Sequence, residues 1–132
     1  MIPKAYNLVM PYLVVTDVKA AIAFYARAFG CVPREMPVDA SGQVSHSEFS
    51  YHAQVFMCAP QNDAPVKTPR ASGVPSPSSL YLYCADVDAF YAQAIHAGAQ
   101  SISAPQDMYW GDRMCRLEDQ DRYVWGFATH HP

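Results

Sequence analysis

Two stretches of the chain decide its fold: residues 14–30, VVTDVKAAIAFYARAFG, and residues 83–98, YCADVDAFYAQAIHAG. Each has an aspartate after a short strand-like run, then Phe-Tyr-Ala in a helical stretch, then a glycine. Asp17 and Asp86 are 69 residues apart, and the same offset relates residues 54–57 to residues 123–126. A repeated supersecondary unit usually cannot bury its apolar face alone, so two copies assemble around a shared core or cleft. The sequence therefore predicts two related units.

Each unit is predicted to have the order β-α-β-β-β. In both units an aspartate (or Thr16 in the first) caps the helix, and a glycine, Gly30 or Gly98, stops it. The predicted strands of the first unit are 8–15, 32–38, 44–49 and 54–58, and those of the second are 80–84, 101–104, 112–118 and 123–129. Pro11 predicts that the first strand lies at an edge or has its ring at an unpaired position.

The connection between the units is rich in proline and serine. Residues 60–77 contain five prolines, which predicts a linker or mobile flap instead of a packed element. The expected organisation is a first unit over residues 1–59, this linker, and a second unit over residues 78–132. The predicted fold class is α+β, with the two units forming curved mixed sheets around a cleft.

Composition restricts the partners. Net charge is −3 with scattered basic residues, which argues against nucleic acid. Only 16 % of residues are charged while 51 % are apolar, which leaves room for a subunit interface and predicts a homodimer. No apolar run reaches the roughly 18 residues of a membrane span, and no signal peptide is evident. The four cysteines form no Cys-x-x-Cys pair, so we expect buried free thiols in a cytoplasmic protein.

The repeat resembles the vicinal oxygen chelate superfamily, which includes glyoxalase I, bleomycin-resistance proteins and extradiol dioxygenases. The resemblance rests on residues 14–17 (VVTD) leading into residues 23–25 (AFY) and Phe29-Gly30. Residues 118–122 (EDQDR), before YVW, are similar to the family's D-P-D-G turn, with Gln120 and Arg122 in place of its proline and glycine. Residues 109–113 (YWGDR) and 46–49 (HSEF) resemble the PhnB-like branch. This resemblance implies the fold but leaves the reaction open.

Members of this superfamily that bind a divalent metal use four strand positions, related in pairs by the repeat. The resemblance places these positions at Met10, Met57, Ser79 and Gly126. Hard divalent cations prefer carboxylate oxygens or imidazole nitrogens, and a single serine hydroxyl does not hold one. We therefore predict that the family's metal site is absent and that no other cofactor is needed.

Strand alternation indicates what lines the cleft instead, since every second side chain shares a face. The residues predicted to face the cleft are Met10, Tyr12, Val14, Val55, Met57, Ser79, Tyr81 and Tyr83. Methionine and tyrosine suit an apolar or aromatic ligand, held by stacking and by phenol hydrogen bonds. The alternative is that these side chains only close the core of a small domain.

Two further groups carry possible chemistry. His46 and Glu48 share a strand face, and they are either a base and its orienting group, a partial metal site, or a hydrogen-bonded surface pair. Trp110 could cover a ligand and Arg113 could clamp an anionic group, or Asp112 and Arg113 could simply lock the turn as a salt bridge. The other histidines, at positions 52, 96, 130 and 131, are assigned no role.

These observations favour a metal-independent small-molecule binding protein of the bleomycin-resistance type, whose ligand is a small aromatic or planar molecule. The alternative is a metal-dependent lyase or isomerase of glyoxalase type with non-standard ligands such as His46 and Glu48. A third possibility is a structural or regulatory dimer without a ligand.

Overall fold

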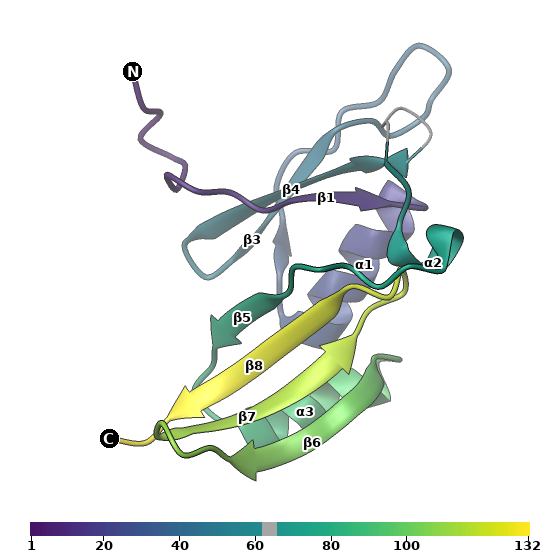
Figure 1. The fold of residues 1–132 in the computed structure, drawn as a ribbon. Coiled ribbons are helices and arrows are strands. Elements are labelled where there is room, and N and C mark those ends of the chain that lie inside the picture. The colour runs from purple at the N-terminus through teal and green to yellow at the C-terminus, as the bar shows by residue number, and fades with distance from the viewer. Residues whose placement is uncertain (62–65) are drawn as a thin grey trace. The chain divides into compact units, whose positions relative to one another are not determined.

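The computed structural model describes residues 1–61 and 66–132, and contacts divide the chain into two units, residues 1–68 and 69–132. The strands of the first unit are β1 (Tyr12–Val15), β2 (Val32–Pro33), β3 (Ser47–Tyr51) and β4 (Gln54–Pro60), and its helix is α1 (Val18–Phe29). The strand order is β1-β4-β3-β2, with β1 parallel to β4 and the other pairs antiparallel. β1 is thus an outer strand of its sheet, as Pro11 predicts (Figure 1).

The second unit repeats this arrangement after a short helix, α2 (Pro69–Ser72). Its elements are β5 (Leu80–Tyr83), α3 (Val87–His96), β6 (Gln100–Asp107), β7 (Asp112–Glu118) and β8 (Val124–His130). The order is β5-β8-β7-β6, again with one parallel pair (Figure 1). The α+β class and the tandem β-α-β-β-β order predicted from the sequence are confirmed.

The repeat extends to the register and to the helix caps. Tyr12 pairs with Met57 in the first sheet, and Tyr81 pairs with Gly126 in the second, so the offset of 69 holds on both strands. Asp17 and Asp86 both have extended backbone; Asp17 accepts a hydrogen bond from one amide of the first helical turn, and Asp86 accepts from two. These bonds satisfy amides that a helix leaves without an intrahelical partner, which explains why both helices begin where they do.

Each helix covers one face of its own sheet and completes an aromatic core there. In the first unit, Tyr25 of α1 stacks on Phe49 of β3 with ring centroids 4.9 Å apart. In the second, Phe90 of α3 packs on Phe127 of β8 at 4.2 Å. Successive strand residues point to opposite faces. Each sheet therefore has a second face that carries no helix of its own unit, which we call the helix-free face.

The strands differ from the prediction in length at places with a clear cause. The first strand begins at Tyr12 instead of residue 8, because the side chain of Asn7 occupies the neighbouring ladder position on Val55. Asn7 Oδ1 accepts from the Val55 amide at 2.8 Å, and Asn7 Nδ2 donates to the Val55 carbonyl at 3.3 Å. The strand predicted over residues 32–38 shortens to Val32–Pro33, because the pairing shifts beyond it. The Arg34 amide donates to the Glu48 carbonyl at 2.9 Å and the Glu48 amide donates to the Glu35 carbonyl at 2.8 Å, so two residues lie opposite Glu48.

Within the predicted linker, residues 62–65 lie outside the described part of the chain. The remainder contains the four-residue helix α2, and Thr68 and Pro69 are buried. Two hydrogen bonds attach Arg70 to the turn between β7 and β8. The Arg70 amide donates to the Asp121 carbonyl at 3.0 Å, and Arg70 Nε donates to the Gln120 carbonyl at 2.7 Å. No helix among the described residues is long and apolar enough to cross a membrane.

Candidate functional site

A buried carboxylate organises the helix-free face of the second sheet. Asp112 opens β7 after a turn in which Gly111 has φ +97° and donates its amide to the Met108 carbonyl at 3.1 Å. Met108 in turn donates its amide to the Asp112 carbonyl at 2.7 Å. The positive φ favours glycine at position 111. The turn therefore fixes where the Asp112 side chain begins.

Four side chains donate to this carboxylate. Oδ2 accepts from Tyr81 Oη at 2.6 Å, Tyr83 Oη at 2.9 Å and Trp110 Nε1 at 3.0 Å. Oδ1 lies 2.8 Å from Nδ1 of His130, the last residue of β8. Asp112 is 2 % exposed, while Tyr81, Tyr83 and Trp110 are 44 %, 55 % and 44 % exposed. We call these five residues the Asp112 cluster.

The hydrogen bonds explain the electrostatics of the cluster. The bond from Tyr81 and the other donors lower the pKa of Asp112 to about 2, so the carboxylate is ionised at neutral pH. The pKa of Tyr81 is raised by burial and by its bond to Asp112, and that of Tyr83 chiefly by its bond to Asp112. Both phenols are therefore protonated and remain donors. The cluster is a network in which one anion holds three aromatic side chains in place.

Arg113 lies on the opposite face of β7. It does not pair with Asp112, since adjacent strand residues point to opposite faces. Its Nε and one terminal nitrogen donate to both carboxylate oxygens of Asp88 in α3, at 2.8 and 2.9 Å, and the other terminal nitrogen lies 3.3 Å from Asp107. The guanidinium predicted as an anion clamp is thus engaged by two carboxylates of its own unit, and the predicted Asp112–Arg113 salt bridge is replaced by these pairs.

In the first unit, the predicted pair His46 and Glu48 have separate partners. His46 precedes β3, and its Nδ1 lies 3.2 Å from Tyr12 Oη. Glu48 is 6 % exposed, and both its oxygens accept from Tyr6 Oη, at 3.1 and 2.9 Å. Arg34 Nε lies 3.3 Å from Glu48 Oε1, and the guanidinium carbon lies 5.3 Å from the centre of the Tyr6 ring.

Met10 and Met57 line an apolar hollow of about 310 Å³ in the first unit. The remaining lining comes from the N-terminal segment, namely Met1, Ile2, Pro3, Tyr6, Asn7 and Leu8. Tyr12, which pairs with Met57 in the sheet, is 54 % exposed. The predicted methionines therefore lie together, next to the Tyr6–Glu48 contact.

The positions that bind metal in the family do not fit a divalent cation here. Met57 lies between Tyr12 and Glu48 in the sheet register and offers only a thioether. A Cβ at Gly126 would lie 3.3 Å from Tyr81 and 3.5 Å from Met114, so neighbouring side chains already occupy the space where a ligand side chain would begin. Across residues 1–61 and 66–132, no group of three or more His, Cys, Asp and Glu side chains could hold a metal ion.

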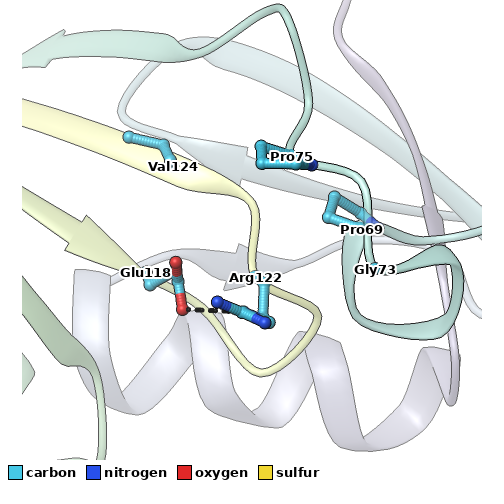
Figure 2. Close-up of a pocket in the computed structure, with 6 residues that line it drawn as sticks. All are labelled: Pro69, Gly73, Pro75, Glu118, Arg122 and Val124. Atoms are coloured by element: carbon cyan, nitrogen blue, oxygen red, sulfur yellow. Dashed lines mark hydrogen bonds and ion pairs between the residues drawn. The ribbon is translucent and has the colours of Figure 1, made fainter.

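A smaller hollow, of about 80 Å³, lies in the second unit between α2 and the β7–β8 turn (Figure 2). Prolines and Val124 form much of its wall, and Arg122 and Glu118 form an ion pair at 3.3 Å. This hollow is small, and its one guanidinium already has a carboxylate partner.

Comparison with known proteins identifies the family. The family model described as the Glyoxalase/Bleomycin resistance protein/Dioxygenase superfamily matches residues 6–127. The chain belongs to this superfamily. An uncharacterized protein of Mycobacterium bovis, Mb0911c, is 31 % identical over 123 residues, covering 89 % of this chain and 80 % of its own length.

Solved structures share the fold at low identity. TioX from Micromonospora sp. ML1 has a TM-score of 0.75 and 20 % identity, with 94 % of this chain and 98 % of that chain covered. A Bacillus cereus protein described as a putative 3-demethylubiquinone-9 3-methyltransferase, PhnB protein, has a TM-score of 0.65 and 16 % identity, covering 93 % and 99 %. The superfamily predicted from the sequence is confirmed, and a PhnB protein is among the structures that share the fold.

Two residues of the cluster were missed by sequence reasoning. The sequence offers Asp112 only as a partner of Arg113 and gives His130 no role. A signal for His130 existed, because Gly126, Ala128 and His130 are spaced by two on one strand and share a face. The predicted end of that strand, at residue 129, stopped one residue short of it.

Proposed function

We propose that this protein binds a small, planar aromatic molecule on the helix-free face of its second sheet, without a divalent metal. The observation that carries the proposal is the Asp112 cluster. Its three aromatic side chains remain 44–55 % exposed although one buried carboxylate fixes their polar ends. Rings that are immobilised before binding lose little entropy when a ligand stacks on them.

The chemistry of the face matches such a ligand. Tyr81 and Tyr83 lie edge to face with centroids 5.7 Å apart, and the Tyr81 ring packs closely over Gly126, where a Cβ would lie 3.3 Å from it. The two phenols donate to Asp112 at 2.6 and 2.9 Å, and Trp110 Nε1 also lies 3.4 Å from Tyr81 Oη, so the polar atoms of this face are gathered at its Asp112 end. A ligand with a flat apolar body and one or two polar groups would satisfy both features.

The proposal is tested by titrating the protein with 2-naphthol in a calorimeter, a readout that does not depend on Trp110. Tyr81→Ala should weaken binding several-fold, because losing a stacked ring costs about 1 kcal/mol beyond the lost area. Tyr91→Ala is the matched control, since Tyr91 lies on α3 and bonds Ser101 instead of the cluster. If Tyr81→Ala and Trp110→Ala both bind as tightly as the parent, these rings only pack and the proposal is wrong.

We further propose a cytoplasmic homodimer. Leu8 and Val9, beside the outer strand β1, are 80 % and 83 % exposed, which is unfavourable for a monomer. All four cysteines are free thiols, as a reducing compartment requires. Native mass spectrometry with elemental analysis tests the dimer and the metal independence together. A species of only 14.6 kDa would refute the dimer, and one equivalent of nickel, zinc, iron or manganese would refute metal independence.

A further inference from the structure

His130 and Asp112 have the geometry of a general base and its orienting group. Asp112 is ionised and can only accept, so the hydrogen of the 2.8 Å contact belongs to His130 Nδ1. In the neutral ring this leaves the lone pair on Nε2. Among residues 1–61 and 66–132, no hydrogen bond is formed by Nε2, and the His130 side chain is 54 % exposed. A base needs this combination of a fixed tautomer and an accessible lone pair.

The turn at Gly111 also fixes the position of the His130 imidazole. A Cβ at residue 111 would lie 3.3 Å from His130 Cε1 and 3.2 Å from the His131 carbonyl oxygen. The His131 amide donates to the Gly111 carbonyl at 2.8 Å, which ties the end of β8 to the turn before β7. Gly111 therefore lets the imidazole lie close over the turn. The same turn carries Trp110. Asp112 therefore holds the imidazole and the aromatic side chains with a single carboxylate.

We propose that His130 acts as a general base on a planar aromatic substrate with an acidic C–H bond, and that Asp112 is its positioning residue. This inference rests on the proposed aromatic binding site and adds a reaction class, proton abstraction, to it. Nε2 takes the proton, and Asp112 stabilises the imidazolium that forms. Tyr81, Tyr83 and Trp110 hold the substrate ring beside the base.

The probe is 5-nitrobenzisoxazole, which is flat and reacts in one base-dependent step. Nε2 removes the proton from C3, and the C–H electron pair becomes the third bond of a nitrile. The N–O bond breaks, and its electrons remain on oxygen as 2-cyano-4-nitrophenolate, which is coloured. The imidazolium then returns its proton to water, so no oxidant, metal or second substrate is needed.

The parent should exceed the buffer rate, and His130→Gln should lose on the order of a hundredfold, the low side of what a positioned base contributes. Added imidazole should restore part of the rate to His130→Ala, which a purely structural role for the ring would not allow. His131→Gln is the matched control, an exposed neighbouring imidazole outside the cluster, and should keep the parent rate. For Asp112→Asn we expect a slower reaction and, by nitrogen NMR at pH 8, a larger Nε2–H tautomer fraction of His130.

The outcomes separate this inference from the proposed function. A parent that binds 2-naphthol but does not accelerate the elimination, or a His130→Gln variant as active as the parent, overturns the general base and leaves the binding site standing. A parent that neither binds 2-naphthol nor reacts overturns both. Loss of rate in His130→Gln with unchanged 2-naphthol affinity supports the assignment of the base to His130.

Discussion

Replacing Arg122 by glycine should stabilise the protein. Arg122 has φ +69° in the turn between β7 and β8, at the position where the family's turn has glycine. The turn is kept despite the substitution: the Arg122 amide donates to the Asp119 carbonyl at 3.0 Å, and the Asp119 amide donates to the Tyr123 carbonyl at 3.0 Å. An L-residue with a Cβ costs roughly 1–2 kcal/mol in this left-handed region, and glycine removes that cost.

Two smaller effects oppose the gain. The Arg122–Glu118 ion pair is lost, but its side chains are 55 % and 24 % exposed, so it contributes about 0.3 kcal/mol (Figure 2). Glycine also gains freedom in the unfolded chain, which costs roughly 0.5 kcal/mol. The expected net stabilisation is about 0.5–1 kcal/mol, or a melting temperature higher by about 2–3 °C for a chain of this length.

Arg122→Ala separates the two contributions. It loses the same ion pair but keeps a Cβ in the left-handed conformation, so it should be slightly less stable than the parent. The free energy of unfolding, measured by urea titration with circular dichroism, should therefore be about 1 kcal/mol higher for Arg122→Gly than for Arg122→Ala. If the alanine variant equals or exceeds the glycine variant, backbone strain at position 122 is not what limits this turn.

Three further results are expected. Asp119→Ala should cost about 3 kcal/mol in urea unfolding, because the carboxylate accepts from two turn amides and from the buried Trp125 indole at 3.0 Å. Burial raises the pKa of the Cys31 and Cys58 thiols to about 12, so both should react with a disulfide reagent far more slowly than after unfolding. The pKa of Asp112 is lowered to about 2, so the stability that this carboxylate contributes is complete above about pH 4 and is lost as pH falls through 2. The NMR signal of the Trp110 indole N–H should report this loss, and an unchanged signal at pH 2 would contradict it.

The fold was predictable because the sequence pattern of the β-α-β-β-β unit occurs twice in the chain. The apolar alternation, the capping aspartates and the offset of 69 residues all specify the same unit. A fold can be predicted from sequence when its local signals agree in this way. The strand predicted over residues 32–38 could not be placed from its apolar content, because a shift in pairing opposite Glu48 ends its regular ladder. The length of β4, which reaches Pro60, was also underestimated, since its end pairs with β1 across the sheet.

The candidate site was predictable in part. Tyrosine hydroxyls in a partly buried position need partners, so strand alternation led to Tyr81 and Tyr83 but not to their acceptor. Asp112 is 31 residues from Tyr81 and 29 from Tyr83 along the chain, and only the β5-β8-β7 order brings it near. Its predicted pairing with Arg113 ignored that neighbouring strand residues diverge. The charges of neighbouring residues therefore did not predict the partners of Asp112, because these depend on the order of the strands in the sheet.

Both units keep aromatic rings in place with a buried carboxylate, but they use different strand positions to do so. In the first, Glu48 pairs with Met57 in the register and accepts from Tyr6. In the second, the residue paired with Gly126 is Arg116, and the carboxylate lies at the start of the strand as Asp112, opposite His130. The strand register is thus the same in the two units while the polar groups of the helix-free faces differ. Because divergence within a repeat marks positions that packing does not dictate, these carboxylates and their partners are where functional variants should be concentrated.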